Sequence, residues 1–280
     1  MLKTDRRPAP GPGAATWDGV MHRLSLNCFG VGDGWPCAIR KHSSFLYQFN
    51  PVTLLLDCGE PVSGSFKATG LGYDAVDRIL LSHLHCDHIG GFFMLMQGYW
   101  LENRRKPLWV HLPEEGIQPI QQMLNAACIF KELLPFRLEF IPWKAGEPVI
   151  TGPVRVTPYP TTHLHRLRQT FQARYPQAFA AYCFLLETDR LRVGHSADIG
   201  TPEDLAPLVA EPLDLLVCEL AHCEPLALFE FLRGRSIRRL LFIHLDRQHW
   251  QNLEATRALA ATALGSIPFS FAHNGEEVRL

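Results

Sequence analysis

Three histidines and an aspartate lie within six consecutive residues of this chain, a density that strongly limits how it can fold. The segment at 83–88 reads HLHCDH, and Gly90 and Gly91 follow it. Neutral imidazole and carboxylate groups are ligands that suit zinc and similar divalent ions. An apolar run at 78–82 precedes the segment, and apolar residues at helical spacing follow it over 89–100. The pattern therefore predicts a metal-binding loop between a buried strand and a helix.

Four side chains cannot fully ligate two metal ions, so further ligands must come from other parts of the chain. Three candidates each follow a predicted strand, and they are His163, Asp198 and His244. His165 lies two residues after His163 and competes with it for the same role, for which we favour His163. Because strand ends at one edge of a sheet lie close together, we expect these side chains to converge on the loop at 83–88.

The rest of the chain alternates short β-like runs with helical segments. Strands are predicted at 24–31, 44–49, 52–56, 78–82, 108–111, 137–141, 153–158, 181–187, 191–194, 213–218 and 239–243. Helices are predicted at 89–100, 114–127, 203–210, 225–232 and 253–264. We expect one domain over 21–280, with two sheets and helices outside them. Residues 1–20, rich in Pro and Gly, are expected to form a flexible lead-in.

Charge and cysteine content exclude several classes of protein. The formal net charge is −1, so no global basic field attracts nucleic acid, and anion binding must come from a local patch. No run of about 18 apolar residues occurs, so no membrane span is expected. The eight cysteines are scattered without a CxxC pair, which is typical of free thiols in a reducing cytoplasm. Cys86 lies between candidate ligands and is an alternative, softer ligand.

The order of these motifs resembles the metallo-β-lactamase superfamily. The segment at 83–88 has the form HxHxDH, and a histidine, an aspartate and a histidine follow it in that order. Residues 54–59, LLLDCG, resemble the first motif of the superfamily, a strand that ends in Asp-x-Gly. The resemblance covers the chain from about residue 22 and implies an α/β fold, an αββα sandwich. It also implies two divalent metal ions, with Zn²⁺ favoured and Mn²⁺ or iron as alternatives.

The resemblance further implies a role for each candidate residue. One metal would be held by His83, His85 and His163. The other would be held by Asp87, His88 and His244. Asp198 would bridge the two ions, and Asp57 would orient the loop at 83–88 without touching a metal.

The opening of the chain resembles the ribonuclease Z and cyclic-phosphodiesterase branch of the superfamily. The likeness lies in residues 29–36, FGVGDGWP, in Arg40 and in the pair Ser43 and Ser44. Two departures are visible. The chain has no Gly/Pro-rich arm of the kind with which ribonuclease Z grips transfer RNA. Where the branch reads His-Glu-Ala-Thr, residues 218–222 read CELAH, so Glu219 is kept as a supporting residue but the histidine is displaced. We therefore expect a small or nucleotide-like anionic substrate rather than a large nucleic acid.

The sequence thus predicts a hydrolase that uses a hydroxide bound by both metals, with a phosphodiester as the favoured substrate. Asp87 would hold the nucleophile and accept its proton. His222 is a candidate acid for the leaving group, or alternatively a histidine at a helix N-terminus that pairs with Glu224. A basic stretch would meet the anionic substrate, or else form a solvated helix face, and its residues are His165, Arg166 and Arg168.

Two other functions fit the same residues. One is a lactone or thioester hydrolase on the same metal site. The other is a non-catalytic metal-binding protein, against which the complete ligand set argues. A homodimer is compatible with the sequence.

Overall fold

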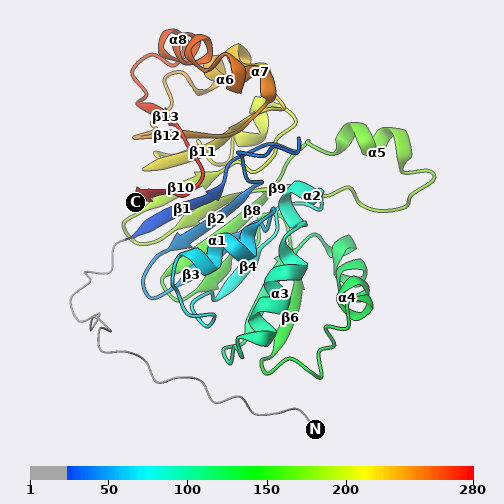
Figure 1. Ribbon diagram of the computed structural model, residues 1–280. Coiled ribbons are helices and arrows are strands. Elements are labelled where there is room, and N and C mark those ends of the chain that lie inside the picture. The colour runs from blue at the N-terminus through cyan, green and yellow to red at the C-terminus, as the bar shows by residue number, and fades with distance from the viewer. Residues whose placement is uncertain (1–23) are drawn as a thin grey trace, which may run out of the picture.

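The computed structural model describes residues 24–280, and its strands form two seven-stranded sheets that pack face to face (Figure 1). The first sheet has the order β14-β1-β2-β3-β4-β5-β6. Its strands are β1 (Ser25–Gly30), β2 (Ser44–Gln48), β3 (Thr53–Leu56), β4 (Arg78–Leu80), β5 (Leu108–Leu112), β6 (Leu138–Pro142) and β14 (Glu276–Arg279). The expected lead-in at 1–20 lies outside the described residues, and a single domain over 21–280 stays a prediction.

The second sheet has the order β13-β12-β11-β10-β9-β8-β7. Its strands are β7 (Val149–Thr151), β8 (Val154–Pro160), β9 (Tyr182–Glu187), β10 (Arg192–His195), β11 (Leu215–Leu220), β12 (Leu240–Leu245) and β13 (Phe269–Phe271). Strands β8, β10, β11 and β12 all run in one direction, because β9 is antiparallel to both β8 and β10 while β10, β11 and β12 are mutually parallel. Their carboxyl ends therefore meet at one edge of the sandwich.

Helices cover the outer face of each sheet (Figure 1). The helices are α1 (Val62–Ala68), α2 (Cys86–Ile89), α3 (Phe92–Leu101), α4 (Ile117–Ala126), α5 (His165–Phe171), α6 (Pro225–Leu232), α7 (Arg247–Gln251) and α8 (Leu253–Ala263). Two short 3₁₀ turns, η1 (Glu114–Gly116) and η2 (Pro202–Leu205), complete the set. Helices α1, α3 and α4 lie on the first sheet and α6 and α8 on the second, so the predicted αββα sandwich is confirmed.

Alternating side chains explain why the strands read as continuous apolar runs. Leu54 and Leu56 of β3 face the other sheet, whereas Leu55 between them packs beneath the helices. In β9, Phe184 faces the first sheet and Leu185 faces the outer helices. Successive side chains of a strand point to opposite faces, so a sheet buried on both faces needs apolar residues at almost every position.

Two predicted helices differ from the structure. The helix predicted at 89–100 forms as α3, which begins at Phe92 after Gly90 and Gly91, and the short helix α2 lies before it in the predicted loop. The helix predicted at 203–210 was wrong, because only the 3₁₀ turn η2 forms there. Pro207 supplies no backbone N–H and its ring obstructs the preceding turn, which prevents an α-helix from continuing.

Six elements were not predicted. They are α1, α2, α7, β7, β13 and β14, whereas a solvated helix at the position of α5 was one of the two alternatives for the basic stretch. All six are short, and α7 buries no residue, so it lacks the apolar stripe by which a helix is recognised in a sequence.

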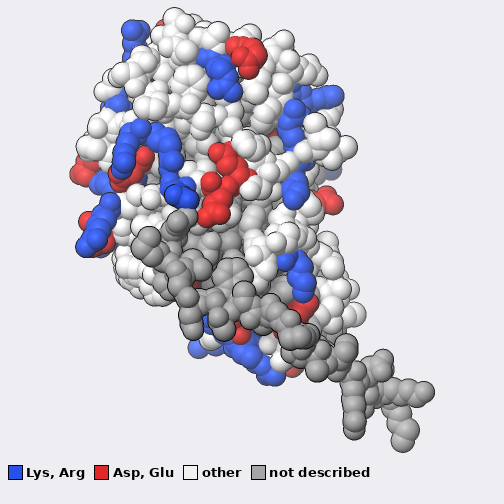
Figure 2. All heavy atoms as spheres, turned by 60° about the vertical axis from the view of Figure 1, so that its left-hand side comes forward, with Lys and Arg blue, Asp and Glu red and all other residues white. Residues whose placement is uncertain are grey.

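The surface is electrically mixed, as the net charge of −1 suggests. Figure 2 shows Lys and Arg side chains interspersed with Asp and Glu on one face of the molecule. Within residues 24–280, none of the helices has the length and apolar character that crossing a membrane requires.

Candidate metal centre

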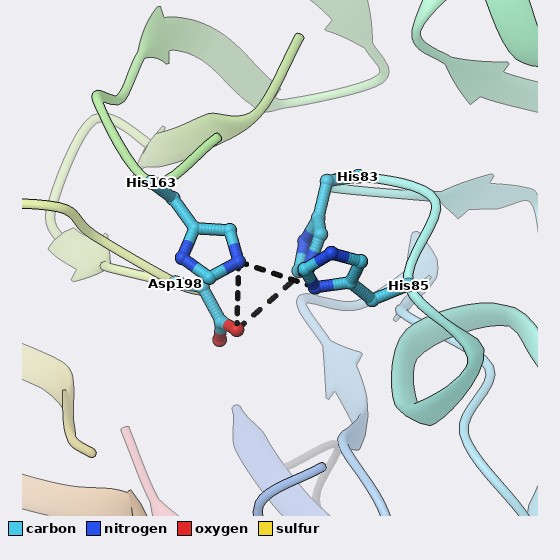
Figure 3. A group of neighbouring side chains, drawn as sticks. All are labelled: His83, His85, His163 and Asp198. Carbon is cyan, nitrogen blue, oxygen red and sulfur yellow. Dashed lines mark hydrogen bonds and ion pairs between the residues drawn. The ribbon is translucent and has the colours of Figure 1, made fainter. Parts of the chain in front are cut away.

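Two adjoining groups of ligand atoms lie at the edge where the carboxyl ends of the strands meet. The first group is formed by His83, His85, His163 and Asp198 (Figure 3). The second is formed by Asp87, His88, Asp198 and His244. Within each group all ligand atoms lie within 4.8 Å of one another. The structure thus brings together all seven candidate ligands from both sheets, and Asp198 belongs to both groups.

The segment after β4 supplies four of these residues. Its backbone passes from an extended conformation at His85 into the short helix α2. His83 follows the strand and is buried, and His85 is extended at the N-terminus of α2. Asp87 and His88 then occupy the first turn of that helix. A Cβ atom at Gly59 would collide with the carbonyl oxygen of Asp87, so glycine in the LLLDCG segment lets β3 approach the loop closely.

The buried carboxylate of Asp57 contacts two residues of the segment at 82–88. Its Oδ1 accepts a hydrogen bond from the backbone N–H of Ser82 at 2.8 Å, and its Oδ2 accepts one from the Ser82 hydroxyl at 2.8 Å. His88 Nδ1 lies 2.6 Å from the same Oδ2. Because Nδ1 of His88 is held by this buried carboxylate, Nε2 is the ring atom presented to the second group.

A second hydrogen bond orients His244 in the same way. Its Nδ1 lies 2.9 Å from the hydroxyl of Ser43, which leaves Nε2 facing the second group. The backbone φ angles are +49° at His244, +44° at Ala197 and +58° at Asp57. Residues other than glycine rarely adopt this left-handed region, so the surrounding structure holds three strand ends in strained conformations around the site.

Several buried polar atoms in the groups have no hydrogen-bond partner among the described residues. They are Nε2 of His83, His88 and His244 and Oδ1 of Asp198. An unpaired buried polar atom costs about 1–3 kcal/mol, and all four atoms belong to residues of the two ligand groups. Imidazole and carboxylate are ligands for zinc and related ions, so the residues present fit a divalent metal at each group.

The spacing of the atoms supports that fit. Asp198 Oδ2 lies 3.5 Å from His163 Nε2 and 3.5 Å from His244 Nε2, and Oδ1 lies 3.3 Å from His88 Nε2. Two ligands each about 2.0–2.1 Å from a tetrahedral metal would be roughly 3.3 Å apart. Oδ2 also lies 3.7 Å from His83 Nε2, so one carboxylate reaches histidines of both groups.

Burial and charge set the protonation of these side chains. Burial lowers the pKa of His83 and takes that of His163 to about 4, so both rings are neutral at neutral pH, the form that binds a metal. Burial opposes charge on His88, but Asp198 and Asp57 outweigh it and raise its pKa. Burial would raise the pKa of Asp198, yet His244 and His88 lower it, so the carboxylate stays ionised.

Glu219 and His222 pair with each other next to the ligand groups, where His222 Nδ1 lies 3.7 Å from Asp198 Oδ2. The buried Glu219 carboxylate accepts backbone hydrogen bonds from Ile199 at 3.1 Å, Ala221 at 2.6 Å and His222 at 3.0 Å. Its Oε1 lies 3.1 Å from His222 Nδ1, so the alternative in which His222 pairs with Glu224 was wrong about the partner. The loop between β11 and α6 folds back so that its backbone N–H groups at Ala221 and His222 contact the Glu219 carboxylate. The imidazole of His222 therefore pairs with Glu219.

Comparisons with known proteins decide the family. The family described as "Anti-Pycsar protein Apyc1" matches residues 24–218, which is more than half of the chain. The chain belongs to the Apyc1 family. Ribonuclease Z of Methanococcus maripaludis (strain C6) is 30% identical over 141 residues, 50% of this chain and 46% of that protein. Ribonuclease Z of Aeropyrum pernix is 33% identical over 107 residues, 38% of this chain and 34% of that protein. The chain thus spans less than half the length of these relatives.

Solved structures confirm the fold. The metallo-β-lactamase fold protein YhfI from Bacillus subtilis superposes with a TM-score of 0.74 at 21% identity, covering 92% of this chain and 100% of that chain. Human tRNase Z, short form, gives a TM-score of 0.68 at 15% identity, covering 91% and 98%. The predicted resemblance to the metallo-β-lactamase superfamily, and in the N-terminal half to its ribonuclease Z branch, is therefore confirmed for this Apyc1-family chain.

The basic stretch of this Apyc1-family chain does not enter either metal group. His165, Arg166 and Arg168 lie on α5, which buries none of its residues and projects away from the sandwich (Figure 1). The return segment is fixed by Glu115, whose carboxylate accepts the backbone N–H groups of 178–180. The residues on α5 therefore lie beside the site, on a projecting arm that comprises residues 165–180 and whose end is held by Glu115.

Sequence reasoning missed several residues that support the site. Ser43 and Ser82 orient metal-site side chains through their hydroxyl groups. Asp204 accepts hydrogen bonds from the backbone N–H groups of Thr162 and Gly200, each next to a candidate ligand region. The Thr-Pro-Glu-Asp sequence at 201–204, a capping box, was the signal that marked Asp204 as a backbone acceptor.

Replacing His163 and His165 separately distinguishes the two candidates for the first group. We expect close to two divalent ions per wild-type chain by elemental analysis after metal loading. His163→Ala should retain close to one, because it removes an inward-facing ligand, whereas His165→Ala should retain close to two. Circular dichroism of each variant controls for folding. Loss of metal from His165→Ala alone would reverse the assignment.

Proposed function

We propose that this chain is a metal-dependent hydrolase that cleaves phosphodiesters, with a nucleotide-like anionic small molecule as substrate. The observation that carries the proposal is the pair of ligand groups that share Asp198, with buried nitrogen atoms directed into them. Relatives named ribonuclease Z support a phosphodiester, because a ribonuclease cleaves that bond. The chain covers only part of those relatives, so its substrate is proposed from its own residues.

The candidate ligands would hold two divalent ions, for which zinc suits the set of five imidazoles and two carboxylates, and manganese or iron are alternatives. When bound, a pair of such ions lowers the pKa of water toward 7 and stabilises negative charge on the attacked group. His83, His85 and His163 would serve one ion and Asp87, His88 and His244 the other, with Asp198 between them.

In this proposal Asp87 would hold the attacking water and accept its proton. Its Oδ2 lies 3.4 Å from His88 Nε2 and 3.7 Å from His244 Nε2, at the opening of the second group. Burial would raise the pKa of this carboxyl, but His88 and His244 outweigh it and lower the pKa. Asp87 is therefore an ionised acceptor at neutral pH.

In this proposal His222 would protonate the leaving group. Its ring centroid lies 4.5 Å from that of His163 and 5.5 Å from that of His244, so it spans the two metal groups. Glu219 holds Nδ1, which leaves Nε2 as the atom that can donate a proton to the departing oxygen. The side chain is 34% exposed, in contrast to the buried ligands, so a substrate can reach it.

The arginines of α5 would add positive charge beside the site, where an anionic substrate approaches. Arg166 and Arg168 are exposed, so each contributes little in water. A permanently charged phosphodiester gains from them, whereas a neutral lactone or thioester does not. A homodimer is compatible with this arrangement.

A substrate panel tests the reaction class. We expect metal-loaded protein to hydrolyse bis-p-nitrophenyl phosphate with a higher kcat/KM than a lactone or a thioester. The double change Arg166→Glu and Arg168→Glu should lower the phosphodiester value about 2- to 10-fold, since the exposed contacts are individually worth under about 1 kcal/mol, and should leave the ester values unchanged. The matched reversal of the exposed Arg233 and Arg235 serves as a control.

Rapid cleavage of lactones or thioesters, with phosphodiesters inert, would contradict the proposal in favour of a carboxyl-ester hydrolase. If no ester of either kind is cleaved by protein that carries its metals, the chain is a non-catalytic metal-binding protein.

The role of His222 is tested by changing the leaving group. A nitrophenolate departs without a proton, whereas an alkoxide needs one. His222→Ala should therefore lower kcat about 10²- to 10⁴-fold for dithymidine monophosphate and far less for bis-p-nitrophenyl phosphate. The exposed His273→Ala is the control and should change neither rate. An equal loss on both substrates would assign His222 to binding or site structure instead.

A further inference from the structure

We propose that the arginines around the amino ends of β11 and β12 form a binding site for a small organic molecule that carries two negatively charged groups. The site lies at the edge of the sandwich opposite the candidate metal centre. From Arg239 to His244 the chain advances five residues along β12, a distance of about 16 Å at about 3.3 Å per residue. The inference therefore concerns a second site and does not depend on the proposed hydrolysis.

The segment that leads into β12 is strongly basic. Residues 233–239 read RGRSIRR, so four of the 27 Lys and Arg residues of the chain lie within seven positions. The formal net charge of the chain is −1, so this segment is a local exception to an electrically balanced molecule. A local concentration of one sign of charge raises the local concentration of ions of the opposite sign.

The end of α6 explains two of the four arginines. Arg233 and Arg235 follow the last turn of that helix, where unpaired carbonyl groups favour positive charge. Nε of Arg235 donates to the carbonyl oxygen of Phe231 at 3.5 Å. Arg238 and Arg239 lie beyond the helix end, so this explanation does not extend to them.

Two cavities that share lining residues lie at this edge. One, of about 400 Å³, is lined by Arg238 and Arg239 of the second sheet and by Arg279 at the end of β14 in the first sheet. The other, of about 330 Å³, is lined by Arg235. Arg238 and Asp214 line both cavities. The site is therefore built from strand ends of both sheets, with Arg238 between its two halves.

Positive side chains outnumber negative ones in the two cavities. Among the described residues that line them, Asp214 is the only acidic side chain. Its Oδ2 accepts a hydrogen bond from the backbone N–H of Arg192 at 2.9 Å, and its Oδ1 lies 3.7 Å from Nη1 of Arg238. Within residues 24–280 the side chain of Arg239 donates to the carbonyl oxygen of Arg279, and neither arginine forms an ion pair. Two guanidinium groups are thus left without an anionic partner.

The walls of the larger cavity suit an organic anion. Leu191, Leu215 and Pro268 line it beside the arginines, so a ligand can place an apolar part against them. Its volume lies within the range of cavities that hold small molecules. The guanidinium group matches carboxylate, sulfate and phosphate groups through its paired N–H donors. Because arginines line both cavities, a ligand with two separated anionic groups can contact both, whereas a single charge reaches one.

Calorimetric titration of metal-loaded protein tests the site. The probes are benzene-1,3-disulfonate, isophthalate, which presents carboxylates in place of sulfonates, and benzenesulfonate, which has one charge. Sulfonates are weak ligands for metal ions, so the candidate metal centre competes little for them. We expect one disulfonate per chain, bound more tightly than benzenesulfonate. Comparison with isophthalate shows which anionic group the arginines prefer.

A double variant locates the bound probe. Arg238→Gln with Arg279→Gln removes two guanidinium groups whose side chains make no hydrogen bond within residues 24–280, so folding should be kept, as circular dichroism can verify. Binding of the disulfonate should weaken about 3- to 30-fold, because partly exposed charge contacts each contribute modestly. Arg105→Gln with Arg257→Gln removes the same charge from exposed positions elsewhere and should leave the affinity unchanged.

Three results would overturn the site. The first is a wild type that binds neither the disulfonate nor isophthalate. The second is wild-type affinity in the variant that lacks Arg238 and Arg279, which would place the probe elsewhere on the molecule. The third is equal weakening by the control pair, because the effect would then come from net charge alone.

Discussion

The site depends on the buried carboxylate of Asp57 and on the donors that surround it. A fully buried carboxylate is costly unless it is hydrogen-bonded, and here Ser82 supplies two bonds and His88 a third contact. These contacts join the end of β3 to the loop after β4 and fix which nitrogen of His88 faces the second group. Backbone hydrogen bonds from Cys58 to His88 and from Gly91 to Cys58 join the same two segments.

Asp198 extends that arrangement to the second sheet. It lies in a strained turn after β10, and its oxygens reach histidines from both sheets. Because β8, β10 and β12 run in the same direction, their ends deliver His163, Asp198 and His244 to one edge. The metal centre therefore lies along the seam of the sandwich, where the hydrophobic core between the sheets keeps the two halves in register.

Local sequence pattern was enough to predict which residues gather at the candidate metal centre. The loop at 83–88 is dense in ligand types, and strand ends placed His163, Asp198 and His244, so the sequence could indicate both groups. Contacts between distant residues were not readable: Ser43 holding His244 spans 201 positions. The pairing of His222 with Glu219 depended on how the loop after β11 folds back, and the failed helix at 203–210 depended on one proline. The arm that carries Arg166 and Arg168 has no apolar stripe, so its helix was only one of two alternatives and its direction could not be inferred.

The central proposal is that one aspartate, Asp198, would join two metal sites, each of which takes ligands from both sheets. Anomalous diffraction from crystals of metal-loaded protein, measured at the absorption edge of the metal, tests it most directly. We expect two peaks per chain, about 3.5–4 Å apart, one in each ligand group and both adjacent to Asp198. A single peak, or peaks outside the two groups, would contradict the claim.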